Sequence, residues 1–134
     1  RGGENRGRGL QMYQRLEMSK YSKIYFIGIG GIGMSAIARF YKFKGYPVAG
    51  YDRTPSDLTH ALEKEGIDIH YKDDPDYIPK DVASTLVVYT PAIPADLQEL
   101  VYVREHGYTL VKRSRMLGEL AEGQTCLAVA GTMP

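Results

Sequence analysis

The sequence contains a single cysteine, Cys126, and only three histidines, His60, His70 and His106. One thiol cannot form an intramolecular disulfide, and it cannot supply the several thiolates of a structural zinc site. No two histidines stand four residues apart, the spacing that places two imidazoles on one helical face. We therefore expect no disulfide framework and no metal site, and the reducing cytoplasm as the compartment.

Long apolar runs and a strong net charge are also absent. No segment approaches the roughly 20 consecutive apolar residues of a transmembrane helix, so we expect no membrane partner. The formal net charge of +1 gives no argument for nucleic acid as a partner. The 134 residues have room for one ordinary domain, and the sequence leaves the oligomeric state open.

The first 22 residues differ in composition from the rest. Residues 1–22 are rich in Gly and Arg and carry five basic against two acidic side chains. They lack the apolar core of a secretory signal. This composition predicts a disordered leader or a vector-derived segment.

After the leader, short apolar runs alternate with stretches of helical period. The predicted strands are 23–29, 47–52, 67–71, 84–90, 108–112 and 124–131. The predicted helices lie between them and end near Gly45, Gly66 and Gly107, with Ser56 as an N-cap and a last short helix at 114–121. The segment 72–83 is expected to be a loop or a single helical turn. This alternation predicts an α/β fold, a Rossmann-like three-layer α/β/α arrangement around a mainly parallel sheet.

Four glycines stand at the junction of the first predicted strand and the first predicted helix. Gly28, Gly30 and Gly33 satisfy the pattern G-x-G-x-x-G in the strand-to-helix context that gives it meaning. We expect Gly28 to allow a tight turn, Gly30 to clear the approach of an anion and Gly33 to permit close packing, while Gly31 removes a further Cβ. Free N–H groups at the helix start would then bind a diphosphate. The alternative is that these glycines serve packing only.

Asp52 ends the second predicted strand, 19 residues after Gly33. In dinucleotide-binding enzymes an acidic residue there accepts a hydrogen bond from a ribose hydroxyl, whereas a surface aspartate could simply cap the next turn. Arg113 and Arg115 either face phosphates or lie at a solvated helix start. These residues indicate a nucleotide diphosphate without saying which nucleotide.

Three segments together resemble a known family. "GIGGIGMSAIA" at 28–38, "YTPAIP" at 89–94 and "RSRMLGELA…CLAVAGT" at 113–132 are similar in order and spacing to the amino-terminal domain of the Mur ligases. The resemblance covers about residues 23–132. It implies a UDP-binding domain at 23–124, a central ATP-binding domain that begins at 125–134, and a role in the synthesis of peptidoglycan. The loop is most similar to members that add L-alanine to UDP-N-acetylmuramate.

The resemblance also assigns residues. It implies that main-chain N–H groups of Gly30, Gly31, Ile32 and Gly33 cradle the diphosphate, with Ser35 donating to a phosphate oxygen and Asp52 and Arg53 near the uridine. A second loop would line the diphosphate and sugar side. The UDP-binding residues that it implies are Gly28, Gly30, Gly31, Ile32, Gly33, Met34, Ser35, Asp52, Arg53, Thr90, Pro91, Ala92 and Ile93.

The carboxyl end departs from the family pattern. Family members continue "AVAGT" into "HGKT", whose lysine and threonine contact ATP phosphates and magnesium. Here Gly131 and Thr132, an incomplete ATP-binding loop, are followed by Met133 and Pro134. We therefore expect an isolated first domain without catalytic residues, inactive alone and holding no cofactor, whereas the intact enzyme would use ATP, magnesium and L-alanine.

Three other interpretations remain open from the residues. The same glycines and Asp52 fit the Rossmann domain of an NAD(P)-dependent oxidoreductase. Within the family, the ligase that recycles peptides onto UDP-N-acetylmuramate shares the same substrate. A regulatory or interaction module without a nucleotide is the third.

Overall fold

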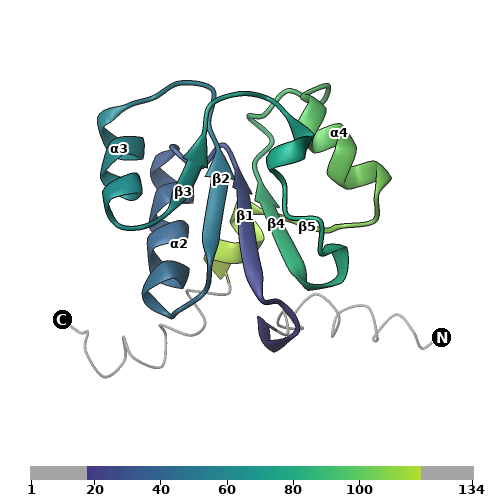
Figure 1. The fold of residues 1–134 in the computed structure, drawn as a ribbon, viewed down its shortest axis with the longest axis horizontal. Helices are drawn as coiled ribbons and strands as arrows, with labels where there is room; N and C mark the ends of the chain where they lie inside the picture. The colour runs from purple at the N-terminus through teal and green to yellow at the C-terminus, as the bar shows by residue number, and fades with distance from the viewer. Residues whose placement is uncertain (1–17, 119–134) are drawn as a thin grey trace.

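The computed structural model describes residues 18–118, which form a parallel five-stranded sheet with helices on both faces (Figure 1). The spatial order of the strands is β3-β2-β1-β4-β5, and all four neighbouring pairs are parallel. The strands are β1 (Lys23–Ile27), β2 (Val48–Tyr51), β3 (Asp68–His70), β4 (Thr85–Tyr89) and β5 (Thr109–Lys112). The sixth predicted strand, 124–131, lies outside the described residues.

Three labelled helices and a fourth that begins after β5 cover the sheet. These are α2 (Ile32–Phe43), α3 (Asp57–Lys64) and α4 (Gln98–Glu105), with residues 113–118 helical as far as the structure is described. Short 3-10 helices occur at η1 (Met18–Lys20), η2 (Pro75–Tyr77) and η3 (Val82–Ser84). The segment 72–83, predicted to be a loop or a single turn, thus contains η2 and most of η3, two short turns.

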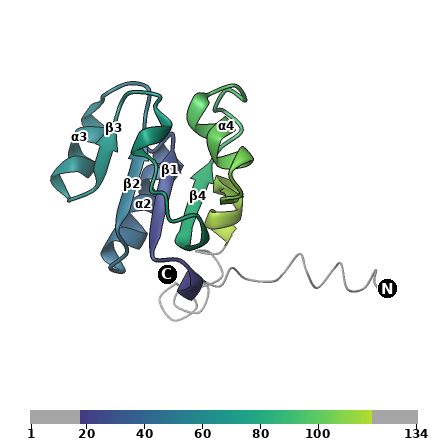
Figure 2. The ribbon, with the colours of Figure 1, turned by 45° about the vertical axis from the view of Figure 1, so that its right-hand side comes forward.

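The core has two halves, one on each face of the sheet. Along β1, Ile24 and Phe26 pack in a cluster with α2, α3 and the helix at 113–118, whereas Tyr25 and Ile27 pack in a cluster with α4. Successive side chains of a strand point to opposite faces, so a strand that is apolar throughout must be covered on both. The turned view of Figure 2 shows α4 on the other side of the sheet from α2 and α3. The predicted three-layer α/β/α fold is thus confirmed.

The predicted helix boundaries are also confirmed. The Ser56 side chain accepts from the Thr59 N–H, and the Thr59 hydroxyl accepts from the Ser56 N–H, which is a capping box. Each helix that was predicted to end near a glycine ends two residues before it, and Gly45 and Gly66 have φ of 100° and 96°. No helix within residues 18–118 has the length and apolarity needed to cross a lipid bilayer.

The order of the strands places a crevice at one edge of the sheet. After β1 the chain moves outward to β2 and β3, and then returns to the other side of β1 as β4. Loops at the carboxyl ends of β1 and β4 therefore run in opposite directions. Ligands of open α/β sheets bind at such a switch point.

Candidate functional site

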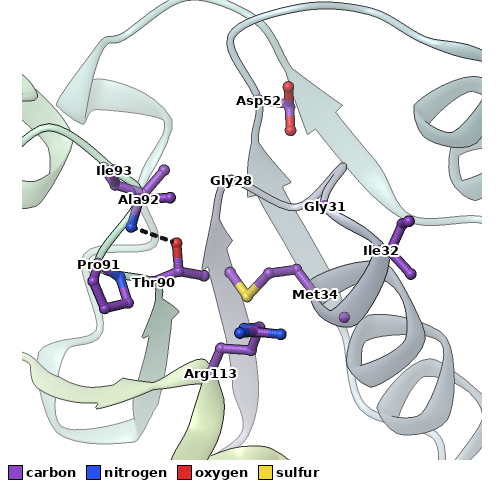
Figure 3. Close-up of a pocket in the computed structure, with 11 residues that line it drawn as sticks. Gly28, Gly31, Ile32, Met34, Asp52, Thr90, Pro91, Ala92, Ile93 and Arg113 are labelled. Carbon is purple, nitrogen blue, oxygen red and sulfur yellow. Dashed lines mark hydrogen bonds between the residues drawn. The ribbon is translucent and has the colours of Figure 1, made fainter.

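A crevice of about 520 Å³ lies where the loops after β1 and β4 diverge. Figure 3 shows the glycine turn and the start of α2 on one side, the loop that follows β4 on the other, and Arg113 between them. The volume lies within the range of about 300–1,000 Å³ that is usual for small-ligand sites. Its walls are formed by Gly28, Gly31, Ile32, Gly33, Met34, Asp52, Thr90, Pro91, Ala92, Ile93 and Arg113.

Gly28 makes the tight turn that was predicted for it. Its φ is +92°, a conformation that L side chains rarely adopt. The N–H groups of Gly28 and Ile29 both donate to the Tyr51 carbonyl, at 2.7 and 3.0 Å. A Cβ at this position would lie 2.8 Å from Cδ1 of Ile93. Glycine at position 28 therefore allows both the turn and the close approach of the opposite loop.

Gly30 has a different role from the one expected. Its N–H donates to Oδ2 of Asp52 at 2.7 Å, so this donor is already used. A Cβ here would lie 2.6 Å from the same oxygen and 2.8 Å from Cγ2 of Thr59. The expectation that Gly30 clears the path of an anion is thus wrong, because it makes room for Asp52 and α3 instead.

The free donors of the turn lie one step further along the chain. The Gly31 N–H donates to the Gly28 carbonyl at 3.2 Å, and Gly31 caps α2 without a side-chain hydrogen bond. The N–H groups of Ile32, Gly33 and Met34 have no acceptor among residues 18–118. Unpaired N–H groups at the positive end of a helix dipole attract an anion. Of the four expected cradle donors, Gly30 and Gly31 already have acceptors, whereas Ile32 and Gly33 have none within residues 18–118.

Ser35 also differs from expectation. Its side chain is buried, and its hydroxyl donates to the Ile32 carbonyl at 2.9 Å. The predicted hydrogen bond from this hydroxyl to a phosphate is not available in this arrangement. Ser35 instead stabilises the first turn of α2.

Arg113 lies against the start of α2. A Cβ at Gly33 would be 2.6 Å from Nη1 of Arg113 and 3.1 Å from its Cδ, so the glycine makes room for the guanidinium. Among residues 18–118 no carboxylate pairs with Arg113. A cation at the positive end of a helix is electrostatically unfavourable until an anion joins the two. Arg113 lines the crevice, which is compatible with the alternative in which it faces phosphates.

The loop after β4 forms the opposite wall. Thr90 organises it, because its hydroxyl accepts from the Ala92 N–H at 3.1 Å and its carbonyl accepts from the Ile93 N–H at 3.1 Å. Behind this loop a second cavity, of about 310 Å³, has Arg104 and Lys112 in its lining. The expected convergence of two loops from different strands is therefore confirmed.

Asp52 and Arg53 end β2 but have different surroundings. Asp52 lines the crevice and accepts two backbone hydrogen bonds, from Gly30 and, at 3.1 Å, from Thr54. Its turn-capping role is thus confirmed, and each carboxylate oxygen retains a further lone pair beyond these two bonds. Arg53 is exposed and does not line the crevice. Gly131 and Thr132 lie outside the described residues.

A buried polar network stands beside the site and was missed in the sequence. The fully buried Glu99 carboxylate accepts from the Tyr25 hydroxyl at 2.5 Å and lies 2.7 Å from Nε2 of His70. Burial, with the nearby Glu99 charge, raises the pKa of Tyr25 well above its usual range. Glu99 shares the buried face of α4 with Leu100 and Val103. The place of Glu99 on the apolar face of this helix could have indicated the network in the sequence, because a buried carboxylate needs hydrogen-bond partners.

Comparisons with known proteins agree with this architecture. The family model described as "Mur ligase family, catalytic domain" matches residues 23–125. The UDP-N-acetylmuramate--L-alanine ligase of Porphyromonas gingivalis is 56% identical over 113 residues, which are 82% of this chain and 25% of that protein. The chain thus spans about a quarter of the length of the curated relatives that it matches.

Two solved structures have the same fold. The UDP-N-acetylmuramate-alanine ligase MurC of Thermotoga maritima matches with a TM-score of 0.69 and 32% identity, over 76% of this chain and 23% of that one. The UDP-N-acetylmuramate:L-alanyl-gamma-D-glutamyl-meso-diaminopimelate ligase of Neisseria meningitides has a TM-score of 0.65 at 24% identity, over 74% of this chain and 31% of that one. The second likeness shows the fold alone. Because the family model matches residues 23–125 and a curated member is 56% identical, the chain belongs to the Mur ligase family.

Proposed function

We propose that this domain binds the UDP part of UDP-N-acetylmuramate in the crevice between the loops after β1 and β4. One observation carries the proposal: three main-chain N–H groups and the Arg113 guanidinium, which have no partner within residues 18–118, converge on one crevice at the switch point of the sheet. A diphosphate supplies the negative charge and the multiple acceptor oxygens that such a set of donors requires.

In this proposal each part of the nucleotide contacts a different part of the crevice wall. The diphosphate lies on the N–H groups of Ile32, Gly33 and Met34, with Arg113 on its other side. Asp52 accepts a hydrogen bond from a ribose hydroxyl with the lone pairs that Gly30 and Thr54 leave free. The loop of Thr90, Pro91, Ala92 and Ile93 covers the diphosphate and sugar, and Arg53 lies nearer the uridine.

For the whole protein we propose ATP-dependent addition of L-alanine to UDP-N-acetylmuramate, a step of peptidoglycan synthesis in the cytoplasm. The names of the most similar relatives support this choice over the peptide-recycling ligase, to which the likeness is 24%. This domain contributes by anchoring the nucleotide, so that the remote carboxylate reaches the reacting groups in a suitable orientation. ATP and magnesium belong to a domain beyond residues 18–118, and we assign no described residue to them.

The alternative of an NAD(P)-dependent oxidoreductase shares the glycine turn but receives no support from the comparisons. Calorimetric titration of the chain with UDP-N-acetylmuramate and, separately, with NAD distinguishes the two. We expect saturable binding of the UDP sugar and none of NAD at the same concentrations. Tighter binding of NAD would refute the proposal, and a module without a nucleotide would bind neither.

A further inference from the structure

Glu99 is a fully buried carboxylate outside the lining of the crevice. Its Oε1 accepts from the Tyr25 hydroxyl at 2.5 Å, and its Oε2 contacts His70 Nε2 at 2.7 Å and accepts from the Asp74 N–H at 3.1 Å. A buried charge is costly unless it is paired and hydrogen-bonded in this way. Within residues 18–118 no group of three or more His, Cys, Asp and Glu side chains could hold a metal ion.

The network fixes the start of α4. Leu97, the N-cap residue, offers no side-chain hydrogen bond, and the Asp73 carboxylate takes that role by accepting from the N–H groups of Gln98 and Glu99 at 2.9 and 3.0 Å. Glu99 itself joins this first turn to β1 through Tyr25 and to the end of β3 through His70. Two carboxylates thus hold one helix end against the sheet, where the helix dipole also favours them.

The start of α4 is one of the two anchors of the crevice wall. Residues 90–97 run from the end of β4 to α4, and the hydrogen bonds of the loop include Ile93 N–H to the Thr90 carbonyl and Leu97 N–H to the Pro94 carbonyl. The Leu97 carbonyl joins the loop to α4 by accepting from the Val101 N–H at 3.0 Å. Among the described residues no hydrogen bond joins 91–96 to the glycine turn or to α2. The distance between the two walls is therefore set by the packing of Ile93 on Gly28 and by the ends of the loop, of which Glu99 holds one.

We propose that Glu99, with Tyr25 and His70 as partners, is a positioning residue for nucleotide binding. It holds the Thr90–Ile93 wall at the separation from the glycine turn that a diphosphate requires. The inference rests on the proposed function of the crevice. The competing role, stability alone, predicts that any comparable loss in the core has the same effect on binding.

The test compares two network variants with a matched control. Glu99→Gln removes the charge with little change in shape, and Tyr25→Phe removes one donor. Thr85→Val is the control, because Thr85 is also fully buried and loses one hydrogen bond, to the Asp81 carbonyl at 2.8 Å. Thr85 lies at the amino end of β4, at the opposite edge of the sheet from the crevice. For each protein we would measure UDP affinity by titration, the thermal unfolding midpoint, and the methyl NMR signals of Ala92 and Ile93.

We expect Glu99→Gln and Tyr25→Phe to weaken UDP binding by roughly tenfold and to shift the Ile93 methyl signals, as coupling through a packed network typically does. Thr85→Val should lower the unfolding midpoint but change the UDP affinity less than about twofold. Unchanged affinity in both network variants, or an equal loss in the control, would overturn the inference. If Glu99→Gln does not fold, Tyr25→Phe decides by the same comparison.

Failure of the proposed function gives a separate result. A wild-type chain that does not bind UDP refutes the function, and the methyl signals then decide the positioning role alone. Ile93 signals that move in the network variants but stay in the control support it. Signals that remain in place in all three variants contradict it.

Discussion

The main-chain N–H of Gly30 donates to the carboxylate of Asp52 at 2.7 Å, across 22 residues of sequence. This bond joins the two positions that a nucleotide-binding pattern treats as separate contacts with the ligand. In this domain they contact each other, and the donors that we propose for the ligand are the next ones along the chain.

Substitution of Gly30 by alanine tests that relationship. A Cβ would lie 2.6 Å from Oδ2 of Asp52, so the hydrogen bond and the α3 contact must shift. We expect Gly30→Ala to lower the free energy of unfolding by about 1–3 kcal/mol, the usual result of overpacking. Gly31→Ala is the matched control, because its Cβ would have no neighbour nearer than 3.7 Å, and urea denaturation of both would show the difference. Equal stability of the two variants would contradict the assigned role of Gly30.

The Asp52 carboxylate can be tested without a change of size. In Asp52→Asn one carboxylate oxygen becomes an NH2 group, which cannot accept a hydrogen bond. One of the two bonds, from Gly30 to Oδ2 or from Thr54 to Oδ1, is therefore lost. We expect a loss of about 1–2 kcal/mol in the free energy of unfolding. We also expect the substitution to reduce the affinity for UDP more than the affinity for inorganic pyrophosphate, because only UDP loses a ribose contact. Denaturation and calorimetry measure the two effects. An equal loss of affinity for both ligands would place the ribose elsewhere.

Arg113 should contribute to binding through charge. We expect Arg113→Gln to weaken UDP affinity by roughly 10- to 100-fold, the range for a charge-assisted hydrogen bond, and to reduce the dependence of affinity on salt. Lys112→Gln is the matched control, since it removes the same charge from the adjacent residue, which lines the second cavity and not the crevice. Titrations at two salt concentrations would measure both variants. A similar loss of affinity in both variants would indicate a long-range electrostatic effect of positive charge and not a direct contact between Arg113 and the ligand.

Alkaline pH should destabilise the domain through buried tyrosines. Burial raises the pKa of Tyr108 to about 12, and its hydroxyl donates to the Pro79 carbonyl at 2.8 Å. Because the pKa is higher in the folded state than the value of about 10 in the unfolded chain, this stability is full below pH 10 and is lost as pH rises through about 12. Thermal unfolding from pH 8 to 12 should show the decline. Tyr108→Phe should show a smaller one, and an identical decline in the variant would contradict this cause.

Local patterns in the sequence predicted much of the fold and one side of the site. The glycines that end helices, the Ser56 cap and the doubly buried strand β1 are each readable from neighbouring residues. The two loops of the crevice also follow from the rule that strands of a parallel sheet end at one edge.

The remaining features depend on contacts between distant residues. The sequence does not show that the Gly30 N–H meets Asp52, that Gly33 accommodates Arg113, or that Glu99 finds Tyr25 across 74 positions. Ser35 has the right residue type at a helix start, but its hydroxyl finds a nearer acceptor in the preceding turn. Residue type and spacing predicted most of the crevice lining, whereas tertiary packing decides which of its donors are already paired.

The most direct test of the account is an amide NMR titration of the chain with UDP. Free N–H groups that bind a diphosphate change their chemical shifts most, so we expect the largest changes at Ile32, Gly33 and Met34, with smaller ones at Gly30 and Gly31. The NMR signal of the Arg113 guanidinium should change over the same range of UDP concentrations. Changes confined to the cavity beside Arg104 and Lys112, or no saturable change at the start of α2, would contradict the account.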